Sequence, residues 1–129
     1  MIEQGIVTYI KNYAALTALQ GARIYPDSLP QDPTLPASVF FSISDPSDYS
    51  HDGQSSWKEQ RFQFDCWAKD PMAAITLKNT LRSALGGFKG TMGATEVYAV
   101  FVENGRVLND DETGIYRRVL EVVFHYKEA

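Results

Sequence analysis

The sequence has few of the features that mark secreted, membrane or nucleic-acid-binding proteins. It has one cysteine, so no internal disulfide can form and a secreted disulfide scaffold is excluded. No apolar stretch approaches the ~20 residues of a membrane span, and the N-terminus lacks the basic region and apolar run of a signal peptide. The net charge is −4, whereas a protein that binds the phosphate backbone is normally basic. These absences predict a soluble intracellular domain, or a part assembled inside a cell.

The sequence also lacks a recognisable catalytic set. Cys66 with His51 or His125 would supply a nucleophile and a base. However, Cys66 alternates with Phe62 and Phe64, which places it on the apolar side of a strand, where a thiol is inert. No Ser-His-Asp order, carboxylate pair or phosphate-binding loop is present. The sequence therefore predicts a protein that is not an enzyme and that takes no cofactor.

Two polar segments carry acidic residues without forming a complete metal site. His51 lies among Asp45, Asp48 and Asp52, whose oxygens are the ligands that hard cations prefer. The segment lacks the bidentate glutamate of a calcium loop, and the two histidines of the chain are too far apart in sequence for a zinc site. Residues 109–112 form a similar acidic cluster. Both are interpreted as solvated turns, and no metal is predicted.

The clearest structural signal is a strand that leads directly into a helix. Residues 57–68 alternate between apolar and polar side chains, as a half-buried strand does. Asp70 and Pro71 then form an N-cap and a first helical turn. Apolar residues follow at helical spacing, and Gly86 and Gly87 end the helix. Its predicted apolar stripe comprises Ala74, Leu77, Leu81, Ala84, Leu85 and Phe88.

The rest of the chain adds a helix and strands joined by loops. An amphipathic helix is predicted over residues 2–19, and a stiff proline-rich loop over 26–36. Short apolar runs predict strands at 23–25, 37–44, 95–103 and 115–126, with long polar loops at 45–56 and 104–114. The expected fold is one α+β domain over 1–129: a mainly antiparallel sheet of four to five strands with two helices on one face, in the order α-β-β-β-α-β-β.

Some predicted surfaces are suited to contact with other subunits. The outer face of the sheet combines Trp67, Arg61 and residues of the last strand, and a partly apolar, partly charged face of this kind is often covered by a partner. The proline-rich loop is either a surface connector or a stiff arm that docks on a neighbour. Candidate subunit-contact residues are Pro30, Pro33, Arg61, Trp67 and Arg117.

The order of these segments resembles the tail completion (tail terminator) proteins of long-tailed bacteriophages and prophages. The similar features are a helix ending in AALTAL, then GARIYPDSLP and LPASVFFSIS, a polar loop with a histidine, the segment RFQFDCWAKDPMAAITLKNTLRSAL, and the closing GIYRRVLEVVFHY. The resemblance covers nearly the whole chain. It implies no catalytic residues, because the family has no catalytic signature.

The resemblance implies a role in assembly of the virion within the bacterial host cytoplasm. Such proteins form a homo-oligomeric ring, usually a hexamer, on the head-proximal end of the tail tube. The ring ends polymerisation of the tube protein, offers a docking surface to the head connector and lets DNA pass without sequence-specific binding or contact with a membrane. The alternative from the same setting is a head-completion or neck adaptor.

We further predict that an acidic loop lines the ring or its axial faces, where negative charge repels DNA phosphates and lets DNA slide. Candidate loop residues are Asp45, Asp48, Tyr49, His51, Asp52, Asn109, Asp110, Asp111 and Glu112.

Overall fold

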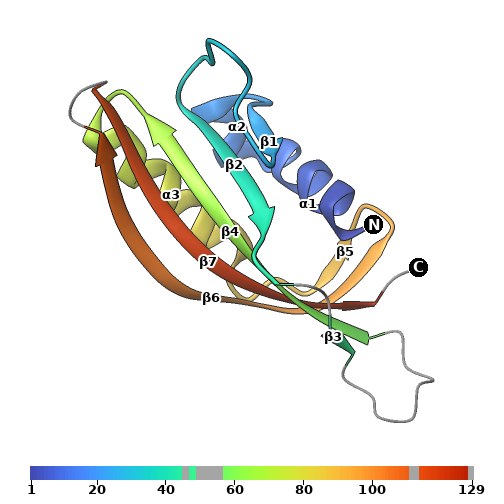
Figure 1. Cartoon of the computed structure of the whole chain (residues 1–129). Coiled ribbons are helices and arrows are strands. Elements are labelled where there is room, and N and C mark those ends of the chain that lie inside the picture. The colour runs from blue at the N-terminus through green and yellow to red at the C-terminus, as the bar shows by residue number, and fades with distance from the viewer. Residues whose placement is uncertain (45–46, 49–56, 111–113, 128–129) are drawn as a thin grey trace.

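The computed structural model describes residues 1–44, 47–48, 57–110 and 114–127, which fold into helices packed on a curled sheet (Figure 1). The helices are α1 (Ile2–Lys11), α2 (Ala14–Gln20) and α3 (Pro71–Leu85). The strands are β1 (Ile24–Pro26), β2 (Ala37–Ser42), β3 (Ser47–Asp48), β4 (Trp57–Ala68), β5 (Gly90–Met92), β6 (Thr95–Asp110) and β7 (Ile115–Lys127).

All seven strands belong to one sheet, in the order β1-β2-β4-β7-β6-β5, with β3 paired to β4 beside β2. Only β1 and β2 run parallel, and the other pairs are antiparallel. The helices cover one face, and α1 contacts both β1 and β5, which lie at opposite ends of the sheet order (Figure 1). The predicted α+β class, the mainly antiparallel sheet and the single helical layer are confirmed. The predicted counts of four to five strands and two helices, and the exact order, are wrong.

The strand-to-helix segment has the predicted structure. Phe62, Phe64 and Cys66 of β4 are buried on the helical side of the sheet. The Asp70 carboxylate accepts a hydrogen bond of 3.0 Å from the Ala73 N–H, so it caps the first turn of α3 as the sequence predicts. The predicted apolar stripe of α3 faces the core, with Phe88 at its partly buried end.

The N-terminal helix is broken in two, which corrects the prediction of one helix over residues 2–19. The Asn12 side chain donates a hydrogen bond of 2.9 Å to the carbonyl of Thr8, and Tyr13 adopts an extended backbone. An asparagine side chain that bonds to the backbone in this way competes with helix continuation. The apolar face is nevertheless as predicted, because Ile2, Ile6, Ile10 and Leu16 are all buried.

The second polar loop is much shorter than predicted, because β6 continues through residues 104–110. These residues pair with β7 as far as Asp110 opposite Ile115. A register shift between Val102 and Asn104 interrupts the period-2 pattern, so the sequence there does not alternate as a regular strand does. The strand predicted at 37–44 ends at Ser42, and two short strands, β3 and β5, were not predicted.

Candidate interaction surfaces

The outer face of the sheet, opposite the helices, holds an ion pair built from two neighbouring strands. Asp65 of β4 lies beside Trp67, which is directly opposite Arg117 of β7. The Arg117 guanidinium donates to the Asp65 carboxylate and lies over the Trp67 ring, 4.9 Å from its centre. The Asp65 side chain is only 4% exposed, and it also accepts a hydrogen bond of 2.9 Å from the Gln63 amide. The negative charge of Asp65 is therefore buried and paired with Arg117.

This patch is not fully satisfied within the described part of the chain. The indole N–H of Trp67 and the Nε–H of Arg117 are both buried without a hydrogen-bond partner. Buried donors normally have partners, so two unpaired donors in one patch are unusual. The structure thus brings together two of the predicted contact residues, Trp67 and Arg117, on one face with Asp65.

A second ion pair spans the same face closer to the middle of the sheet. The Arg61 guanidinium lies 2.5 Å from the Glu103 carboxylate, and between them passes β7. Glu103 is the extra residue at the register shift of β6, so the ion pair ties the bulge to the centre of the sheet. Val123, which is opposite both Arg61 and Phe101, is buried beneath this contact.

The two open edges of the sheet both carry exposed apolar residues. On β6, Phe101 is 53% and Val107 is 59% exposed, and β5 covers only the first three residues of that strand. At the opposite edge, Ile43 follows β2 and is 38% exposed. Large apolar side chains that are exposed at strand edges make these edges candidates for contact with another chain.

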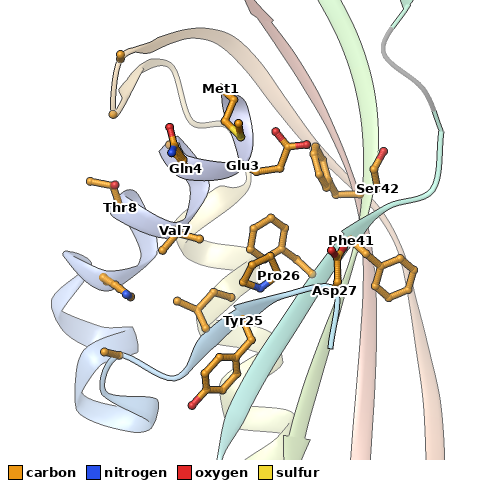
Figure 2. Close-up of a pocket in the computed structure, with 18 residues that line it drawn as sticks. Met1, Glu3, Gln4, Val7, Thr8, Tyr25, Pro26, Asp27, Phe41 and Ser42 are labelled. Atoms are coloured by element: carbon orange, nitrogen blue, oxygen red, sulfur yellow. The ribbon is translucent and has the colours of Figure 1, made fainter. Parts of the chain in front are cut away.

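A groove of about 960 Å³ lies between α1, the end of β1 and the last residues of β2 (Figure 2). Phe40 and Phe62 contribute to its apolar floor, while Glu3, Asp27 and Lys11 supply charge at its walls. These charged groups come from different elements and form no cluster suited to a cation or to catalysis. The groove is a mainly apolar hollow beside the end of β2.

Cys66 and His125, the two described residues among those considered for catalysis, do not form a site. Cys66 is fully buried, and burial is the main cause that raises the pKa of its thiol. His125 lies on the opposite face of the sheet, against the ring of Phe101, and burial lowers the pKa of its imidazole. A thiol on one face and an imidazole on the other cannot share a proton. Among the described residues, no group of three or more His, Cys, Asp or Glu side chains is arranged for a metal.

Most of the predicted loop residues lie outside the described part of the chain. They are Asp45, Tyr49, His51, Asp52, Asp111 and Glu112. Three others lie in strands, which corrects their placement in loops: Asp48 belongs to β3, and Asn109 and Asp110 belong to β6. Their backbones pair with Lys58, Tyr116 and Ile115, respectively. In the proline-rich loop, Pro30 is exposed and Pro33 is partly buried.

Among the described residues, several surfaces are candidates for contact, and Cys, His, Asp and Glu side chains do not gather into a metal site. No helix among them has the length and apolar character to cross a membrane. The chain belongs to the tail completion protein gp17 family, which matches residues 4–127. It is therefore a structural component of a phage particle, and its place is in the virion.

A solved structure has the same fold. A chain from the virion of a native gene transfer agent particle superposes with a TM-score of 0.70 at 17% sequence identity. The match covers 93% of this chain and 90% of that chain. The comparison with curated proteins returns no match.

The sequence did not reveal the open edge of β6 or the groove beside α1. Both depend on which strands are neighbours. The only local signal was a pair of apolar residues, Val107 and Leu108, within the polar run that was interpreted as a loop.

Proposed function

We propose that copies of this chain close into a ring, a hexamer, on the head-proximal end of the tail tube. The ring ends polymerisation of the tube protein and offers a docking surface to the head connector, and DNA passes through its centre. Family membership across residues 4–127 is the observation that carries this proposal.

The surfaces of the chain support a closed ring of head-to-tail contacts. Such a contact joins two different surfaces of the same protein, and rotation then closes the assembly. This chain has two different sheet edges with exposed apolar residues, one at Phe101 and one at Ile43. A two-fold dimer would need only one of them.

The outer face of the sheet is the second contact surface of the proposal. Because Asp65 is paired with Arg117, covering these two residues buries no unpaired charge, which lowers the electrostatic cost of a partner at this position. The acidic loops then remain as candidates for the lumen or the axial faces, where they would repel DNA phosphates. Basic residues lining the channel of an imaged ring would contradict this part of the proposal.

The proposal is tested by the mass of the protein in solution, alone and with purified tail tubes. Light scattering over a range of concentrations, followed by negative-stain imaging, is expected to find closed rings, either free or only at one tube end. Binding to purified head connectors without any binding to tubes would instead identify a neck adaptor.

A further inference from the structure

From the two open edges of the sheet we infer how neighbouring copies join: β6 of one copy adds to the end of β2 of the next, with Phe101 opposite Ile43. This inference rests on the proposed ring, and it names the residues of the contact. The occupant of each edge is thus a second copy of this chain. The joint makes one sheet continuous from copy to copy.

The first edge is a short window on β6. Gly87, just after α3, donates a hydrogen bond of 3.1 Å to the carbonyl of Val100, and this closes the edge on one side. The register shift after Val102 bounds the window on the other side, because it interrupts the regular alternation of backbone groups along β6. Between them stand Phe101, 53% exposed, and the outward backbone groups of Val102. An apolar side chain beside unpaired backbone is what a strand needs to add another.

The second edge is an equally short window on β2. Strand β1 covers β2 only as far as Phe40, which is opposite Pro26. Beyond it, Ile43 donates a hydrogen bond of 3.0 Å to Arg61 of β4, so the backbone groups of the preceding residue, Ser42, point away from β4. Ser42 is exposed and lines the groove of Figure 2. Its N–H and C=O are therefore available to a neighbouring strand.

The two windows match in direction and in the face that their side chains occupy. The pairs β2–β4, β4–β7 and β7–β6 are all antiparallel, so β6 runs opposite to β2 within one copy. If the next copy continues the sheet in the same orientation, its β2 is therefore antiparallel to β6 of the first copy. Phe101 lies opposite Val123, and Val123 lies opposite Arg61, to which Ile43 is bonded. Phe101 and Ile43 thus end the same row of side chains, on the outer face.

The hydrogen-bonding pattern also matches. In an antiparallel sheet, successive residues of a strand direct their backbone N–H and C=O groups alternately to the two neighbouring strands. Starting from the bond between Ile43 and Arg61, this alternation directs the backbone groups of Phe101 to β7 and those of Val102 outward. Phe101 and Ile43 of two copies then form a non-hydrogen-bonded pair. The adjacent pair, Val102 and Ser42, exchanges backbone hydrogen bonds.

The bulge of β6 solves a steric problem in this joint. Immediately beyond the contact, the neighbour's β2 is already covered by β1, whose pairing extends as far as Phe40. A bulge bends its strand, and the one after Val102 occurs at this level, so the joint requires the rest of β6 to bend away from the neighbour's β1. The ion pair from Arg61 to Glu103 holds the bulge in place.

The inference is tested by disulfide trapping, because directly opposite non-hydrogen-bonded residues have Cα atoms about 4.5 Å apart, within the range of a disulfide. The native Cys66 is buried and does not interfere. The variants are Ile43→Cys, Phe101→Cys and the double variant, oxidised under the conditions in which rings or capped tubes are imaged. The matched control is Ile43→Cys with Val107→Cys, which is exposed on the same strand but on the helical face.

The double variant is expected to give a ladder of covalent oligomers on a non-reducing gel. An equal mixture of the two single variants should give dimers only, each single variant alone should remain monomeric, and the control pair should give no ladder. A covalent dimer of Phe101→Cys alone would overturn the inference in favour of a two-fold joint. Rings without a ladder would overturn it while leaving the proposed function intact, and the absence of rings, capped tubes and ladder would overturn both.

Discussion

The ion pair on the outer sheet face provides a quantitative test of the structure. In Arg117→Met, the methionine side chain still covers the sheet face as the aliphatic part of Arg117 does, but the buried Asp65 carboxylate loses its positively charged partner. Its remaining partner is the Gln63 amide at 2.9 Å. Removing one member of a buried pair costs about 3–5 kcal/mol. Because Arg117 is itself 28% exposed, water can partly replace it, and we expect about 3 kcal/mol, the lower end of that range.

The reciprocal change should cost less. In Asp65→Leu, the Arg117 guanidinium loses a charged hydrogen bond but stays partly hydrated, which predicts a loss of about 2 kcal/mol. The double variant, Asp65→Leu with Arg117→Met, leaves no unpaired charge and should be within about 1 kcal/mol of the wild type. The predicted coupling between the two positions is therefore at least about 4 kcal/mol.

Urea denaturation at neutral pH, followed by far-ultraviolet circular dichroism, gives the free energy of unfolding of each variant. Tryptophan fluorescence is less suitable, because Trp67 lies under the guanidinium. If the loss in the double variant equals the sum of the two single losses, Asp65 and Arg117 do not interact and the reasoning is wrong.

Four further predictions concern single residues. Gly5→Ala should lower the free energy of unfolding, measured in urea, by about 1–3 kcal/mol, because the new methyl group would collide with the backbone of Met92. The same change would stabilise an ordinary helix, so a gain in stability would contradict the close contact of α1 and β5. Asp70→Ala should cost about 0.5–2 kcal/mol in the same assay through loss of the cap, and an unchanged midpoint would show that the cap contributes nothing. Since burial raises the pKa of the Cys66 thiol, a thiol reagent at pH 8 should label it only in denaturant, and Cys66→Ser should still assemble; rapid labelling of the native protein, or loss of assembly, would be the opposite outcome. Burial lowers the pKa of His125, so folding favours its neutral imidazole, and this contribution to stability is fully present above the unfolded pKa of about 6.5 and is lost as the pH falls through the folded pKa. Between pH 7.5 and 5, the melting temperature should therefore fall more steeply for the wild type than for His125→Gln. Parallel curves for the two proteins would refute the assignment.

The central strand and helix were predictable because their signals are local. Alternation in residues 57–68 and the cap at Asp70 each depend on neighbours in sequence, and both have the predicted structure. The break after Lys11 was not predictable in the same way. Residues on both sides of it continue one apolar face, so the pattern gives no sign of the interruption at Asn12.

The contact surfaces were only partly predictable. Alternation placed Arg61 and Trp67 on the outer face, and the structure confirms this placement and adds Arg117 opposite Trp67. The partner of Arg61 was missed, because Glu103 belongs to a bulge whose extra residue changes the pattern. The use of these residues as subunit contacts stays a prediction, as does the role of the proline-rich loop.

The open windows at Phe101 and Ile43 could not be inferred from the sequence. A strand edge is open or closed according to which strands lie beside it. That order brings β7 between β4 and β6, although β7 is the last strand in the chain. Long-range order of this kind leaves no local pattern in the residues that it exposes.

The most direct test of the central claim is to image purified tail tubes after adding the protein. The account predicts a ring at one end of each tube, the head-proximal end, and no further growth of that end when tube protein is added. Binding along the sides of the tubes, at both ends, or at an end that continues to grow would contradict it.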